Sequence, residues 1–115
     1  MVYIADGDDN TKRVTVIGVN KYESTTFKVI HTSSVKVGRH EKIVSHSVTS
    51  TNHLIASFSN GSALMMYLDN FRDIHFKRPS NESIIITMND YVMVSPINNF
   101  KNVGLCHFTE FFLNI

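Results

Sequence analysis

Cysteine is almost absent from the sequence, because Cys106 is the single cysteine among 115 residues. One thiol excludes an internal disulfide framework and any zinc site built on cysteine pairs. The fold must therefore be stabilised by a hydrophobic core, and a chain of this length can form one. We predict a single domain over residues 1–115 in a reducing, cytoplasmic setting.

A strong net charge and long apolar runs are also missing. The formal net charge is +1, so no long-range field attracts the whole molecule to nucleic acid or to an acidic membrane. The N-terminal residues lack the pattern of a secretory signal, and no apolar run approaches the roughly 18 residues that cross a bilayer. A hydrophobic content of 43% with 18% charged residues excludes a disordered chain.

Residues 27–50 are the longest stretch with β-strand patterning, and we expect the fold to be organised around them. Two alternating runs flank residues 38–41, which predicts a β-hairpin. His31 and His46 fall on its more apolar face. A four-residue loop places the two histidines diagonally, whereas a two-residue loop at Gly38 places them directly opposite, and the sequence leaves both registers open.

Four further segments have strand character. Strands are predicted at residues 2–5, 13–19 and 54–58, and a second hairpin at residues 84–94 turns at Asn89-Asp90. The tail allows two interpretations. Its aromatic content favours a closing strand over residues 103–113, although Leu105, Phe108 and Phe112 also recur at helical spacing.

One helix is predicted over residues 63–73. Ser62 is a suitable N-cap, and apolar side chains then recur on one helical face. The fold class that follows is α+β: an antiparallel sheet of about six strands built from hairpins, with this helix packed on one face. The alternative is a small, partly open β-barrel.

Histidine is the residue type that suggests chemistry. His31 and His46 could exchange a proton near neutral pH, which is the basis of a minority hypothesis of a histidine-dependent hydrolase or nuclease. A catalytic zinc requires three protein ligands, and the hairpin supplies only two. The favoured interpretation is that both are structural residues, so no catalytic residue, metal or cofactor is predicted.

Three groups of side chains are candidates for binding. The hairpin tip and residues 75–78 carry basic groups that could contact phosphates, and the C-terminal phenylalanines could cover a partner. These candidates are Lys36, Arg39, His40, Lys42, His75, Lys77, Arg78, Phe111 and Phe112.

The predicted function is a non-enzymatic protein-binding module. The absence of an assembled catalytic motif and the apolar C-terminal segment support it. Its small size suggests an accessory or inhibitory protein of a virus or phage that acts on a host protein. The alternative partner is nucleic acid or a nucleotide, and a homo-oligomer formed through the C-terminal segment is a further prediction.

Overall fold

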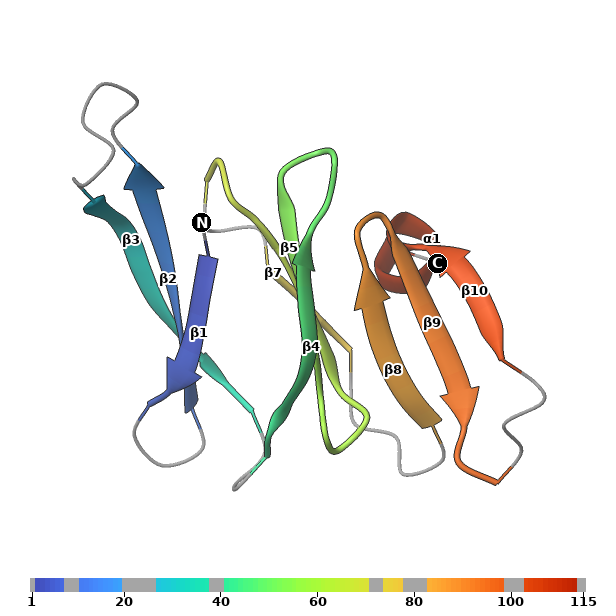
Figure 1. Ribbon diagram of the computed structural model, residues 1–115. Helices are drawn as coiled ribbons and strands as arrows, with labels where there is room; N and C mark the ends of the chain where they lie inside the picture. The colour runs from blue at the N-terminus through green and yellow to red at the C-terminus, as the bar shows by residue number, and fades with distance from the viewer. Residues whose placement is uncertain are drawn as a thin grey trace. The chain divides into compact units, whose positions relative to one another are not determined.

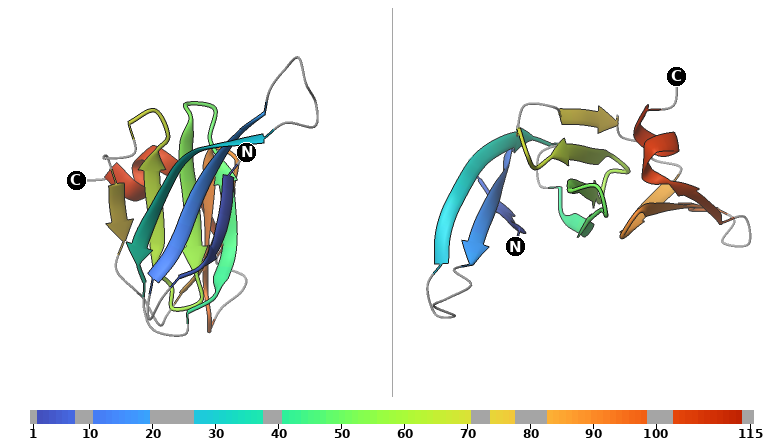
Figure 2. Two further views of the ribbon diagram at one scale, coloured as in Figure 1. Left: turned by 90° about the vertical axis from the view of Figure 1, so that its left-hand side faces the viewer. Right: turned by 90° about the horizontal axis from the view of Figure 1, so that it is seen from above.

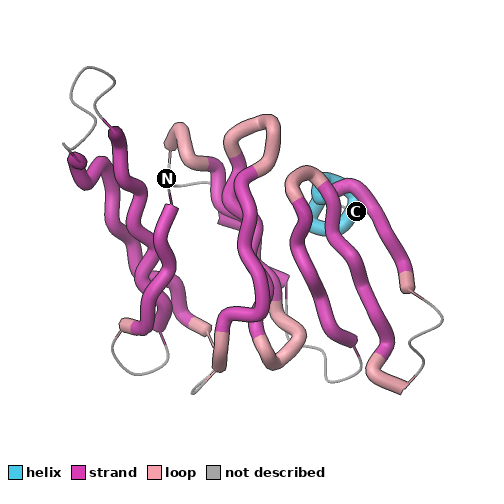
Figure 3. The backbone as a smooth tube through the Cα atoms, in the orientation of Figure 1, coloured by secondary structure: helices cyan, strands magenta, loops and turns pink. Residues whose placement is uncertain are grey.

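A computed structural model describes residues 2–7, 11–19, 27–37, 41–70, 74–77, 83–98 and 103–113. Strands dominate these residues, and a single short helix follows the last strand (Figures 1 and 3). The elements are β1 (Val2–Asp6), β2 (Thr11–Val19), β3 (Phe27–Lys36), β4 (Ile43–Val48), β5 (His53–Phe58), β6 (Ala63–Tyr67), β7 (Ile74–Lys77), β8 (Ser83–Met88), β9 (Tyr91–Pro96), β10 (Gly104–His107) and α1 (Phe108–Leu113).

The strands form three antiparallel sheets, and each described strand pairs with a neighbour in the sequence. The orders are β1-β2-β3, β4-β5-β6-β7 and β10-β9-β8. The prediction of an antiparallel, hairpin-built fold is confirmed. The prediction of one sheet of about six strands is wrong, and none of the three sheets closes into a barrel among the described residues.

The chain divides into two compact units, residues 1–40 and residues 41–115. In the first unit, β2 pairs with both β1 and β3. Val14, Val16 and Val35 are buried, and Lys12 forms an ion pair with Asp6. A register shift between Val16 and Ile17 marks a β-bulge in the β2–β3 pair.

The hairpin predicted over residues 27–50 is not found among the described strand pairs. β3 pairs with β2, which sets His31 opposite Val16, and β4 pairs with β5, which sets His46 opposite Ala56. Both predicted registers between the two histidines are therefore wrong. The alternation of apolar and polar residues fixes which face of a strand is buried, but it does not determine which strand pairs with it. Both β3 and β4 have another possible partner strand nearby in sequence.

The helix predicted over residues 63–73 is also wrong, because residues 63–67 form β6. This strand lies in the interior of its sheet, and its side chains are buried on both faces. Met65 is buried on one face, and Leu64 and Met66 are buried on the other. A strand buried on both faces has a continuous apolar sequence, which periodicity cannot distinguish from a buried helix. Ser62 therefore ends a hairpin turn in which Gly61 has a φ of 80°.

The core of the second unit lies between its two sheets and α1. Its buried members come from β5, β6, β8, β9 and the start of α1. Figure 2 shows α1 on the side of the β8–β10 sheet that faces β7, and both β7 and β9 contact it. These core residues are Ile55, Ala63, Met65, Ile85, Val92 and Phe108.

The C-terminal segment combines both of its sequence interpretations. The predicted strand is confirmed over β10 only, and the helical spacing then becomes α1. Phe108 begins the helix and is 2% exposed. A strand continued to residue 113 would turn adjacent phenylalanines to opposite faces, whereas one helical turn lets Phe111 and Phe112 both pack against the core.

Candidate binding groove between the two sheets of the second unit

The edges of β4 and β8 lie side by side and are joined by Ser45 (Figure 1). The backbone N–H of Thr87 donates to Ser45 Oγ at 2.8 Å, and the Thr87 hydroxyl donates to the same atom at 3.1 Å. Ser45 Oγ also lies 2.7 Å from Ser57 Oγ. Because Ser45 already accepts two hydrogen bonds, its own proton is available for Ser57. This side chain takes the place of a backbone acceptor where the two sheets meet.

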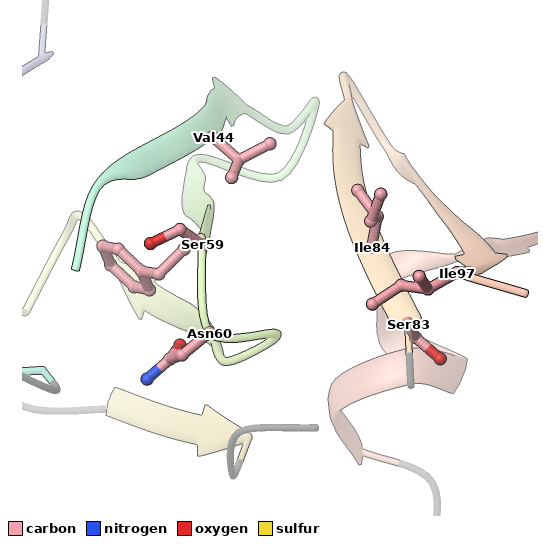
Figure 4. Close-up of a pocket in the computed structure, with 7 residues that line it drawn as sticks. Val44, Ser59, Asn60, Ser83, Ile84 and Ile97 are labelled. Atoms are coloured by element: carbon pink, nitrogen blue, oxygen red, sulfur yellow. The ribbon is translucent and has the colours of Figure 1, made fainter. Parts of the chain in front are cut away.

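A cavity opens between the same two sheets near the start of β4 and β8. Its volume is about 430 Å³, within the usual size of ligand sites. Figure 4 shows Val44 on one wall and Ile84 and Ile97 on the other, with the space between them. Phe58, which is 2% exposed, also lines it. The cavity thus presents aliphatic side chains from both sheets.

The polar lining residues of the cavity are Ser59, Asn60 and Ser83. Ser59 N–H donates to the Lys42 carbonyl at 2.8 Å, Lys42 N–H donates to Ser59 Oγ at 2.9 Å, and the Ser59 hydroxyl donates to Glu41. Asn60 Oδ1 accepts from Ser62 N–H at 3.0 Å. These bonds fix the β5–β6 turn at the rim. Among the described residues, none that lines the cavity is ionisable, so these walls suit a neutral, largely apolar group.

An exposed apolar face continues from the cavity across the β8–β10 sheet. The strand registers place alternate residues of β8, β9 and β10 on this outer face. Met88 is 51% exposed, Tyr91 48% and Leu105 63%. Contiguous apolar surface of this kind is typical of interaction sites. The apolar members of the face are Ile84, Ile86, Met88, Tyr91, Met93 and Leu105.

Two further histidines of this unit lie beside Phe108. His53 and His107 pack against the ring of Phe108, with centroid distances of 5.2 and 4.7 Å. Their Nδ1 atoms contact Thr51 and Thr109 hydroxyls at 2.9 and 2.8 Å. These partners fix the rings beside a buried phenylalanine, which is a structural role.

Asp90 connects two turns of the second unit, near His107. Its carboxylate accepts the Ser50 N–H at 2.6 Å and the Ser50 hydroxyl at 2.7 Å, and its carbonyl accepts Phe108 N–H at 2.8 Å. The Ser50 hydroxyl, then its N–H, and the nearby His107 lower the pKa of Asp90. The carboxylate therefore stays charged at neutral pH and ties the β4–β5 turn to the β8–β9 turn.

The predicted basic residues are distributed over separate elements. Lys36 ends β3 and Lys42 precedes β4, both exposed, while Arg39, His40 and Arg78 lie outside the described residues. His75 and Lys77 are in β7. Lys77 Nζ donates to the Phe111 carbonyl at 3.2 Å and lies 4.3 Å from the Phe111 ring centroid. Lys77 therefore holds the end of α1.

The predicted C-terminal contact residues lie within α1. Phe111 and Phe112 are partly buried against the core, with ring centroids 4.9 Å apart. Among the described residues, no three histidine, cysteine or acidic side chains gather where they could hold a metal. No described helix is long and apolar enough to cross a membrane.

The sequence analysis did not predict the groove, which is the cavity between β4 and β8, because it considered each strand separately. One signal was present: residues 84–86 are three consecutive isoleucines, so both faces of β8 had to be apolar. Comparisons of the chain with protein-family models, with curated proteins and with solved structures gave no match. The function has to be inferred from the residues of this chain.

Proposed function

We propose that the chain is a non-enzymatic protein-binding module, in which the groove between β4 and β8 receives an apolar side chain of a partner protein. The observation that carries the proposal is the neutral cavity of about 430 Å³ between Val44, Ile84 and Ile97. Interfaces commonly place one anchor side chain in a pocket and surround it with apolar contacts. The outer face of β8–β10 supplies such surroundings.

The proposed partner surface is aliphatic or aromatic and carries no charge at its centre. A charged anchor would lose its hydration among the described lining residues, which are all neutral. At the rim, the Glu41 carboxylate already accepts the Ser59 hydroxyl. Complete burial of a leucine or phenylalanine side chain contributes about 1.5–3 kcal/mol. A single anchor therefore gives weak binding, and the exposed sheet face has to contribute the remaining contacts.

The first test uses blocked peptides of the form acetyl-Gly-X-Gly-amide, with X as leucine, phenylalanine or lysine. In two-dimensional amide NMR spectra of the labelled protein, the leucine and phenylalanine peptides should shift the signals of Ser59, Asn60 and Ile84. The lysine peptide should leave them in place. Equal shifts with all three peptides, or none at peptide solubility, would contradict the proposal.

A matched pair of variants locates the binding. Ile97→Glu places a charge beside the cavity, whereas Ile74→Glu makes the same change on β7; the exposed fractions are 42% and 41%. We expect Ile97→Glu to weaken peptide binding, measured by the NMR signal shifts, about tenfold or more, in line with the loss of a central contact. Ile74→Glu should leave them unchanged. Phage display of random peptides should then return sequences with a common apolar anchor.

A further inference from the structure

The turn between β5 and β6 contains the only Asn-Gly pair of the sequence, Asn60-Gly61. Asparagine is a thermally unstable residue, because the main-chain nitrogen of the next residue can attack its carboxamide carbon. A glycine in the next position leaves that approach open, since glycine has no Cβ. Asn60 is partly exposed and lines the cavity, so water has access to it. The turn therefore contains the reacting groups of a deamidation.

Three hydrogen bonds hold these reacting groups. Gly61 N–H donates to the Phe58 carbonyl at 3.0 Å, and Gly61 has a φ of 80°. Asn60 Oδ1 accepts the Ser62 N–H at 3.0 Å and the Ser62 hydroxyl at 2.5 Å. Ser62 is 0% exposed, so water does not compete for its two donors. The carboxamide is thus fixed toward Ser62, and the attacking nitrogen has its proton engaged with Phe58.

We propose that Asn60 is a site of spontaneous deamidation, that the bonds from Ser62 slow the reaction, and that its products prevent the groove from binding apolar partners. Gly61 N loses its proton to a base in solution and forms a bond to Asn60 Cγ. The bond between Cγ and Nδ2 breaks, and the nitrogen takes up a proton and leaves as ammonia. Water then opens the resulting succinimide ring at either carbonyl carbon, which gives aspartate or isoaspartate.

Both products place a carboxylate among the neutral described residues of the cavity. Figure 4 shows Asn60 on the same side of the cavity as Val44 and Ser59. The Ser59 hydroxyl already donates to the Glu41 carboxylate, so the new charge lies near an existing negative charge. An apolar partner would remove water from the new carboxylate without supplying a cation. This effect on binding rests on the proposed function, whereas the deamidation itself does not.

The two products differ in their effect on the turn. Aspartate retains an oxygen that can accept the bonds from Ser62. Isoaspartate lengthens the main chain by a carbon within the turn that the Phe58 N–H closes by donating to the Ser62 carbonyl at 2.9 Å. Isoaspartate should therefore also weaken the closure of the β5–β6 hairpin.

Peptide mass spectrometry of the full chain, aged in mildly alkaline buffer, measures the conversion of Asn60. One hydrogen bond contributes a factor of roughly 2–10, so the folded wild type should convert about tenfold or more slowly than the guanidinium-unfolded chain. Ser62→Ala should convert faster than the folded wild type by roughly the factor of one bond. Ser50→Ala is the matched control, because it removes a serine hydroxyl bond, to Asp90, from another turn of the same unit. It should convert at the wild-type rate.

Three outcomes would overturn the assignment of this site. Equal rates in the folded and unfolded chains, or a Ser62→Ala variant no faster than the wild type, would show that the Ser62 bonds do not slow the reaction. Equal acceleration in Ser50→Ala would assign the effect to general loosening of the unit. An Asn60 that stays intact in both the folded wild type and Ser62→Ala would show that the folded chain does not undergo this modification.

The effect on the groove is measured on deamidated protein separated by anion exchange, because deamidation adds a negative charge. The deamidated form and Asn60→Asp should bind the leucine peptide at least about tenfold more weakly than the intact protein. Equal binding would overturn the effect on the groove even if Asn60 converts. An intact protein that does not bind the leucine peptide would overturn the proposed function and this effect together, while mass spectrometry alone decides the conversion of Asn60.

Discussion

Single polar side chains carry much of the organisation of the second unit. Ser45 accepts the backbone N–H of Thr87 where a neighbouring strand would otherwise have supplied a carbonyl. Thr87 is 6% exposed, so its N–H has little access to water. A buried donor without an acceptor costs about 1–3 kcal/mol, more than a typical hydrogen bond contributes when intact.

Replacing Ser45 with alanine should therefore lower the free energy of unfolding by about 1–3 kcal/mol. Ser57→Ala is the control, because it leaves the bond between Ser45 and Thr87 in place and should cost less. Urea titration monitored by circular dichroism measures both. Equal losses in the two variants would show that the hydroxyl pair, and not the Thr87 N–H, is what matters.

The thiol of Cys106 is predicted to be unreactive. Burial first, and the nearby Glu110 second, raise its pKa above the ordinary value, although Lys77 opposes them. Since the thiolate is the reactive form, modification by a chromogenic disulfide reagent at pH 8 should be roughly tenfold slower or more than in urea-unfolded protein. Glu110→Gln should react faster than the wild type. A folded protein that reacts as fast as the unfolded chain would contradict this assignment.

At the scale of elements, alternation and turn chemistry predicted the strands well. The hairpin at residues 84–94 is confirmed, with Asn89 at a φ of 50° in its turn. The prediction for β6 was wrong, because burial on both faces removes the hydrophobic period that distinguishes a strand from a helix. The prediction that β3 pairs with β4 was wrong, because the local sequence of a strand does not determine which neighbouring strand it pairs with.

The same limit applies to the candidate site. The groove depends on Ser45 and Thr87, which are 42 positions apart and bring together two sheets. No local sequence pattern predicts a contact between residues so far apart in the chain. Sequence reasoning could not foresee that Lys77 would hold α1, because Phe111 lies 34 positions further along the chain.

The turn of the β8–β9 hairpin offers a test at this scale. Asn89→Val should destabilise the protein by about 1–2 kcal/mol, because a β-branched side chain is strained at positive φ. Asn89→Gly should be neutral or slightly stabilising. Asn98→Val is the control, since Asn98 is an exposed turn residue without a positive φ. Thermal unfolding of the three variants would show a loss confined to Asn89→Val.

Across the second unit, acid should loosen the connection between the two sheets. The folded-state pKa of Asp90 lies below its ordinary value of 3.8, so its stabilising contribution is present above that value. The contribution is lost as the pH falls through the folded-state pKa. Urea midpoints measured from about pH 5 to pH 2 should therefore fall more steeply in the wild type than in Asp90→Asn. Ser50→Ala should be intermediate, because the backbone N–H remains.

The pairing of each described strand with a sequence neighbour has a consequence for how the chain folds. Each hairpin can form from strands that are close in sequence, without waiting for distant segments to pair. The entropic cost of loop closure therefore stays low. We expect refolding in stopped-flow experiments to be faster than for β-sandwiches of similar length, whose strands return over long connections. The late step should be the meeting of β4 with β8, and Ser45→Ala should then accelerate unfolding more than it slows refolding.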